Sequence, residues 1–157
     1  MLNSVFTQLL LIVLATLLVV AAVIDVRTFT ISNKLNLAVA LLAPVYWLAV
    51  PLSLWPEVPI QIAGALIVFI FLAAAFYAGM MGGGDVKLAA AIALWFPPAL
   101  TIKFLVLMSV AGGVLTLGLL VWHRAKHREG RPEIPYGVAI AFGALAILAQ
   151  PYLNHFA

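Results

Sequence analysis

The sequence predicts an all-α membrane protein, a bundle of six transmembrane helices with both termini on the extracytoplasmic side. The first observation is composition: 66% of the 157 residues are hydrophobic and only 8% are charged. A soluble domain is about half apolar and about a quarter charged. The second is that apolar runs recur along almost the whole chain. We therefore expect residues 1–157 to form a single integral-membrane domain.

Short polar segments separate six apolar runs. A secretory signal carries basic residues before its apolar stretch, and no basic residue precedes the first run here. We therefore interpret that run as a retained helix. The fourth run is short: a helix from Gly84 to Pro97 would rise about 20 Å, against about 30 Å of hydrocarbon core. We expect the Gly-rich loop before it to dip into a polar pocket, where irregular backbone is tolerated. The expected helices are 5–24, 35–50, 60–78, 86–96, 100–122 and 136–153.

The distribution of cations predicts the orientation, because cytoplasmic loops carry the excess of Lys and Arg. The opposite side would carry only Lys103. Asp25 and Asp85 then lie on the cytoplasmic side. The cations of the three predicted cytoplasmic loops are Arg27, Lys34, Lys87, Arg124, Lys126, Arg128 and Arg131.

Asp25 and Asp85 are the acidic residues that adjoin helix ends on one face of the membrane. An ionisable group inside a membrane is a functional candidate. A purely structural interpretation stays open, with Asp85 as the cap of the fourth helix and Asp25 as an ordinary juxtamembrane charge. However, a helix C-terminus disfavours an anion such as Asp25. The three glycines 82–84 also exceed what a cap requires.

Two carboxylates in one pocket indicate acid–base chemistry. Because they cannot both ionise easily, such a pair shares a proton. One carboxylate can then act as a base on a water molecule while the other acts as an acid on a carbonyl. An aspartyl peptidase works in this way and needs no cofactor. The absence of cysteine excludes Cys nucleophiles, disulfides and Cys-ligated metals.

Three stretches resemble one family. "GGGDVKL" (82–88) resembles the GxGD signature of the prepilin peptidases, or type IV leader peptidases, which are intramembrane aspartyl peptidases. "DVRTFTISNKL" (25–35) is similar to the family's other aspartate motif, D-x-x-x-x-x-I-P-N-x-L, with Ser32 in place of the usual proline, a departure that we expect to alter the turn. "IPYGVAIAFGAL" (134–145) resembles the family's P-x-G-x-A-x-x-x-G stretch.

The resemblance implies an aspartic endopeptidase with Asp25 and Asp85 as its catalytic pair. Gly82 and Gly84 would let the substrate or the loop approach closely, and Asn33 would contact the pocket. The implied substrates are prepilins or pseudopilins, which carry a short basic leader before an apolar helix. Cleavage would occur at the cytoplasmic face of a bacterial inner membrane, for pilus assembly or secretion. We expect the lipid bilayer as surroundings and no nucleic-acid partner; the oligomeric state is open.

The size resembles the short family members linked to Flp (tight-adherence) pili. Larger members carry an additional cytoplasmic region with a Cys₄ zinc site and also methylate the new N-terminus. This sequence has neither that region nor any cysteine. We therefore expect a peptidase without N-methyltransferase activity.

Other residues keep two interpretations. Lys87 would either tune the pair or bind substrate, or it would be an anchor at the membrane interface. His123 and His127 are spaced to share a helix face as metal ligands, but no acidic or Cys partner is close in sequence, so we expect no metal. The four tryptophans are expected in the aromatic belts at the membrane edges: Trp47, Trp55, Trp95 and Trp122.

Two other functions stay as alternatives. In a proton-coupled carrier, Asp25 and Asp85 would relay protons. Such carriers usually show paired broken helices in two related halves, whereas this sequence shows one break and no repeat. In a non-enzymatic subunit of a pilus or secretion machine, Asp85 would serve only as a cap.

Overall fold

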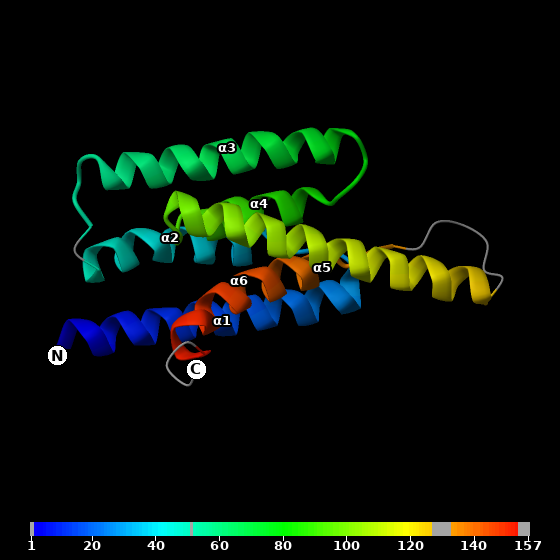
Figure 1. The fold of residues 1–157 in the computed structure, drawn as a ribbon, viewed down its shortest axis with the longest axis horizontal. Coiled ribbons are helices and arrows are strands. Elements are labelled where there is room, and N and C mark those ends of the chain that lie inside the picture. The colour runs from blue at the N-terminus through cyan, green and yellow to red at the C-terminus, as the bar shows by residue number, and fades with distance from the viewer. Residues whose placement is uncertain (1, 51, 127–132, 154–157) are drawn as a thin grey trace.

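The computed structural model describes residues 2–50, 52–126 and 133–153, and these are all-helical (Figure 1). The helices follow the order of the predicted apolar runs, and the last has the predicted bounds. The first helix begins earlier and ends later in the chain than expected, so Asp25 lies inside its last turn. The helices are α1 (Leu2–Thr28), α2 (Asn33–Ala49), α3 (Glu57–Tyr77), α4 (Gly83–Ala93), α5 (Pro98–Ala125) and α6 (Tyr136–Leu153).

Three helices are long and apolar enough to cross a membrane, namely Ser4–Thr28, Glu57–Tyr77 and Pro98–Ala125. Tyr136–Gln150 is a shorter apolar helix. The all-helical class is thus confirmed, while the six crossings and the sides of the termini stay predictions. The 11 residues of α4 span about 16 Å, roughly half of a hydrocarbon core.

Helix α4 lies inside the bundle. It packs against α2, α3 and α6, while α1 packs on α2 and α6, and α5 packs on α6 (Figure 1). Its small side chains let neighbouring helices approach closely. A short helix covered on several sides holds its N-terminal end in a fixed place. The buried residues of α4 are Asp85, Val86, Leu88, Ala89, Ala91, Ile92 and Ala93.

Two tryptophans join α2 to the end of α4. The indole N–H of Trp47 donates to the Leu94 carbonyl at 2.8 Å, and that of Trp95 donates to the Val39 carbonyl at 3.0 Å. Trp95 is buried, with 2% of its surface exposed. The belt prediction is therefore wrong for Trp95, because a buried indole N–H needs a partner and finds one in the neighbouring helix.

The backbone of the turn before α2 is one that proline can also adopt. Ser32 has a φ of −68°, within the range of proline, and its hydroxyl accepts from the Leu35 N–H at 3.3 Å. The expectation that serine alters this turn stays a prediction. Serine adds a side-chain cap that proline does not offer.

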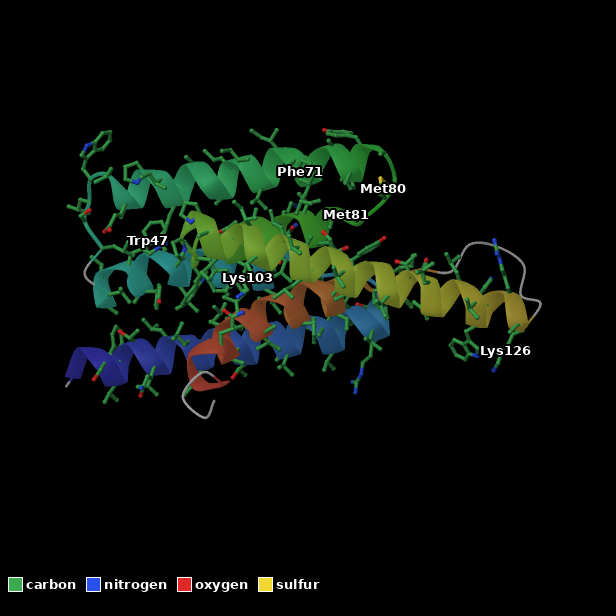
Figure 2. All side chains as sticks on the ribbon, viewed as in Figure 1. Trp47, Phe71, Met80, Met81, Lys103 and Lys126 are labelled. Carbon is green, nitrogen blue, oxygen red and sulfur yellow. The ribbon has the colours of Figure 1, made fainter. Side chains whose placement is uncertain are left out.

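Most of the described cations lie at or near helix ends. Arg27 is in the last turn of α1 and Lys34 is in the first turn of α2. Lys87 is the fifth residue of α4, and Lys126 follows α5. Figure 2 shows Lys103 and Lys126 far apart along α5. His127, Arg128, Glu129 and Arg131 lie outside the described residues.

We predict that Trp95→Phe loosens the junction between α2 and α4. The change keeps a buried ring but removes the N–H that meets the Val39 carbonyl. We expect a loss of at least about 1 kcal/mol in the free energy of unfolding, which lowers the melting temperature in detergent by about 3 °C. The matched control is Trp122→Phe, since Trp122 is 54% exposed. An equal drop in both variants would contradict the assignment.

Candidate active site

Asp25 lies where α1 ends. The chain reverses at Phe29, whose φ of 50° is left-handed and whose N–H donates to the Asp25 carbonyl at 2.8 Å. Such a residue stops a helix, because the helical hydrogen-bond pattern cannot continue through it. The reversal brings Ile31 back toward the last turn of α1. Only 2% of the surface of Asp25 is exposed.

The first turn of α6 holds the Asp25 carboxylate. The Gly137 N–H donates to Asp25 Oδ2 at 2.7 Å. The first N–H groups of a helix have no partner within it, and the helix dipole favours a negative charge there. A Cβ on Gly137 would lie 2.8 Å from Asp25 Oδ2 and 2.7 Å from Ile31 Cδ1, so no side chain fits. The sequence analysis assigned Gly137 no role, although the P-x-G motif around it was the available signal.

Asp85 lies in the first turn of α4 and accepts from the Gly82 N–H at 3.1 Å. This is the carboxylate half of a capping box. The N-cap itself is Gly82, so the expectation that Asp85 is the N-cap is wrong; Asp85 instead contributes to the cap by accepting the Gly82 N–H. Gly83 and Gly84 belong to the helix itself, whereas the connection before it contains Gly79, with a φ of 69°, and Gly82. Two of the three glycines thus lie in the helix rather than in a loop.

Ile31 lies between the two aspartate sites. A Cβ on Gly84 would come within 2.8 Å of the Ile31 carbonyl oxygen, and the Ile31 side chain also reaches Gly137. At Gly84 it is therefore the loop after α1 that approaches closely. Gly84 directly precedes Asp85, and Gly137 binds Asp25, so the two aspartates lie on either side of the same Ile31 contact.

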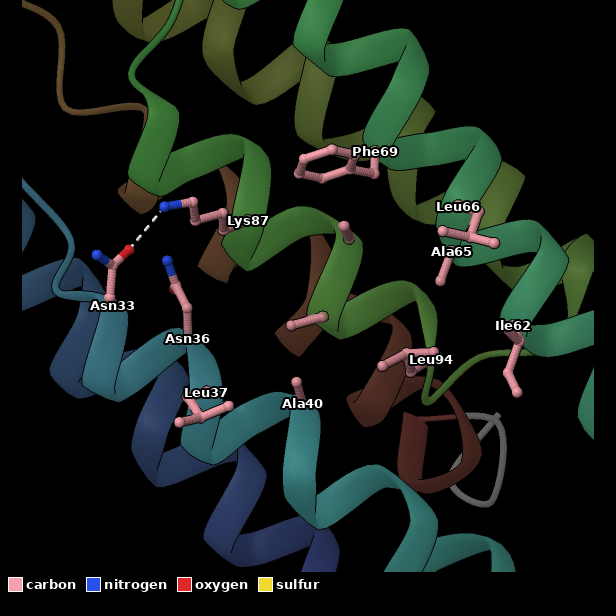
Figure 3. A pocket seen from close by; sticks show the side chains of 12 residues that line it. Asn33, Asn36, Leu37, Ala40, Ile62, Ala65, Leu66, Phe69, Lys87 and Leu94 are labelled. Atoms are coloured by element: carbon pink, nitrogen blue, oxygen red, sulfur yellow. Dashed lines mark hydrogen bonds between the residues drawn. The ribbon is translucent and has the colours of Figure 1, made fainter.

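Asn33 and Lys87 meet at the rim of a separate groove. Lys87 Nζ donates to Asn33 Oδ1 at 2.8 Å, and both side chains are exposed (Figure 3). Asn36 Nδ2 donates to the Gly84 carbonyl at 2.9 Å. The sequence analysis gave Asn36 no place in the site, and its only signal was a polar residue three positions after Asn33, hence on the same helix face.

Within the described ranges, no three His, Asp or Glu side chains are grouped so as to hold a metal ion. His123 lies in the last turn of α5. His127 lies outside the described residues.

A model of the type IV leader peptidase family matches residues 12–117, which include both aspartates and cover more than half of the chain. The chain belongs to the type IV leader peptidase family. The resemblance drawn from the sequence motifs is thereby confirmed, and membership implies a peptidase. No curated protein and no solved structure matches the chain.

We predict that Gly137→Ala impairs the peptidase. The added methyl would lie 3.0 Å or less from Asp25 Cβ, Asp25 Oδ2 and Ile31 Cδ1, so the carboxylate must move. A displacement of about 1 Å at a reacting group costs up to about 100-fold in rate. The measurement is the rate of leader removal by purified protein in detergent.

Gly118→Ala is the matched control, because a Cβ there meets nothing within 4 Å. We expect the control to cleave at the wild-type rate. Full activity of Gly137→Ala would show that the contact between Gly137 and Asp25 does not position the carboxylate.

Proposed function

We propose that this protein is an intramembrane aspartyl endopeptidase that removes the short basic leader from prepilins or pseudopilins, with Asp25 and Asp85 as the catalytic pair. One observation carries the proposal. Two carboxylates from different helices are buried near each other, and a glycine N–H holds Oδ2 of each. Carboxylates are costly inside a membrane and are retained there for function.

The proposed chemistry uses both carboxylates. The ionised one takes a proton from a water molecule, whose oxygen attacks the carbonyl carbon of the scissile peptide. The protonated one gives its proton to the carbonyl oxygen, so a neutral tetrahedral diol forms. The diol then collapses: the C–N bond breaks, the amine nitrogen gains a proton, and a carboxyl group forms on the leader. No covalent enzyme intermediate is needed.

Fixed backbone donors suit this mechanism. Gly137 and Gly82 each engage one carboxylate oxygen, Oδ2, through a hydrogen bond from a helix N-terminus. These bonds orient the two carboxylates before substrate arrives, and pre-oriented groups react faster because little reorganisation is required.

The proposed setting is a bacterial inner membrane with residues 1–157 as one peptidase domain and both termini outside. The cations at or near the ends of α1, α4 and α5 support a cytoplasmic site under the positive-inside rule. A basic leader would then meet the pair from the cytoplasm. Flp-type (tight-adherence) pili, which the short family members serve, are the proposed system, and pilus assembly or secretion is the proposed role.

Membership of a peptidase family favours this function over a proton-coupled carrier. The capping bond of Asp85 is real, but a cap alone gives no reason for a second carboxylate, Asp25, to be buried within range of its charge. The capping and catalytic roles of Asp85 are compatible, because the cap uses only Oδ2.

We predict that Asp25→Asn and Asp85→Asn each reduce cleavage by at least about 100-fold, since an amide can neither take nor give the proton. The assay is co-expression with a candidate prepilin and detection of leader removal on a gel, with membrane levels checked by immunoblot. Glu57→Gln is the control, because Glu57 lies at the start of α3, where its exposed side chain accepts from the Ser53 N–H. Cleavage that survives either Asp change would contradict the proposal.

We predict that the mature pilin leaves this enzyme with a free, unmethylated N-terminal amine. The family's methyl transfer accompanies a Cys₄ zinc region, and this chain has no cysteine. Mass spectrometry of the N-terminal peptide, after co-expression in a host without another leader peptidase, measures this directly. A mass increase of one methyl group would contradict the prediction.

A further inference from the structure

Helix α2 is joined to α4 by side-chain hydrogen bonds at both ends of the shorter helix. Where α4 ends, two indole N–H groups make the bonds described above. Where α4 begins, Lys87 donates to Asn33 on the exposed side. On the buried side, Asn36 donates to the Gly84 carbonyl at 2.9 Å (Figure 3). The bond from Asn36 therefore reaches the residue directly before Asp85.

This bond holds the peptide unit from which Asp85 begins. The carbonyl of Gly84 and the N–H of Asp85 belong to one peptide unit, and a peptide unit is planar and stiff. Asn36 Nδ2 binds the oxygen of that unit, and its N–H donates to the Gly82 carbonyl at 3.1 Å. Fixing both ends of a planar unit fixes the direction in which the chain continues. The place of the Asp85 side chain thus depends on a hydrogen bond from another helix.

Apolar packing defines the position of α4 along α2 only weakly. The 11 residues of α4 include two glycines and four alanines, which form a smooth helix surface. On α2, the residues one and two turns after Asn36 on the same face are Val39 and Ala43, and both are fully buried. In coiled coils, a single buried asparagine specifies the register of two helices at a cost in stability. Asn36 has the position and the chemistry for the same task here.

The amide of Asn36 adds little to the stability of the bundle. Its Oδ1 is buried and has no hydrogen-bond partner among the described residues, which costs at least as much free energy as one hydrogen bond contributes. A helical carbonyl such as that of Gly84 also pairs with the N–H four residues later, so it would stay paired without Asn36. A leucine side chain has the same branched shape and neither polar atom. For folding alone, leucine would serve as well at this position.

We propose that Asn36 is a positioning residue for Asp85. Its hydrogen bond sets the register of α4 against α2 and holds the Gly84–Asp85 peptide in the orientation that catalysis requires. The inference rests on the proposed function, because it explains how one member of the catalytic pair is kept in place. Asn36 is 5% exposed on the inner face of α2, so it acts through Asp85 and not on the substrate itself.

The test compares two buried amides. Asn36→Leu keeps the branched shape of the side chain and removes its donor and its acceptor. Gln61→Met is the matched control, since Gln61 is also 5% exposed and its buried Oε1 has no partner in the described part of the chain. Gln61 lies near the start of α3, at the end of the bundle where α2 finishes (Figure 1). That end is opposite to the start of α4.

We expect Asn36→Leu to lower kcat at least about tenfold, because a displaced carboxylate slows the chemical step. KM for a prepilin that the wild type cleaves should change less than about twofold, since no substrate contact is lost. The melting temperature in detergent should fall by no more than about 2 °C, because the lost bond and the removed unpaired acceptor offset each other. Gln61→Met should keep the wild-type kcat and KM. An unchanged kcat in Asn36→Leu, or an equal loss in both variants, would overturn the proposal.

Asn36→Thr provides a second variant. Its hydroxyl is too short to replace the amide and bonds instead to the carbonyl one turn earlier in its own helix. We expect the same loss of kcat as in Asn36→Leu, although the side chain stays polar. A wild-type kcat in Asn36→Thr would show that the bond to Gly84 is not what matters. Failure of both variants to fold would also overturn the proposal, because Asn36 would then be required for the fold in general.

A readout that needs no cleavage keeps this inference distinct from the proposed function. Met80 is 65% exposed shortly before α4, and the chain has no cysteine, so Met80→Cys carries a single trifluoromethyl label for ¹⁹F NMR. We expect a shifted or doubled line in Asn36→Leu and the wild-type line in Gln61→Met. An unchanged line in Asn36→Leu would reject the positioning role alone. Continued cleavage by Asp25→Asn or Asp85→Asn would instead reject the proposed function.

Discussion

The close approach of the Ile31 segment to two glycines determines where both carboxylates stand. The backbone and side chain of Ile31 press on Gly84 at the start of α4 and on Gly137 at the start of α6. Gly84 directly precedes Asp85 in the chain, and Gly137 donates a hydrogen bond to Asp25. A Cβ at either glycine would separate the helices. Because a close-packed interior transmits strain instead of absorbing it, such a separation would move a carboxylate.

Helix N-termini are the physical means of keeping two carboxylates inside an apolar bundle. A buried carboxylate is tolerated only where hydrogen bonds and favourable charge replace its water. The start of α4 supplies this for Asp85 and the start of α6 supplies it for Asp25. The structural and chemical interpretations of Asp85 therefore do not compete: the same bond that caps the helix orients the acid.

Much of the site could be predicted from local patterns. The aspartates, the glycines before Asp85 and the P-x-G stretch were recognisable because each motif is contiguous in the chain. Trp95 shows the limit of such reasoning. An apolar run that ends near a Trp and two prolines indicates the end of a helix at a membrane edge. The same pattern occurs whether the Trp faces lipid or a neighbouring helix, so the sequence does not distinguish the two. Its partner, the Val39 carbonyl, comes from a distant segment.

The sequence by itself determined the helical class, the order of the helices, the family and the identity of the two acidic residues, because periodic apolar runs and contiguous motifs are local properties. Only the tertiary structure decided that Gly137 binds Asp25, that Asn36 binds Gly84 and that α2, α3 and α4 enclose a groove. These contacts join segments far apart in the chain. They depend on how the helices pack, and no spacing within one helix encodes the partner across the interface.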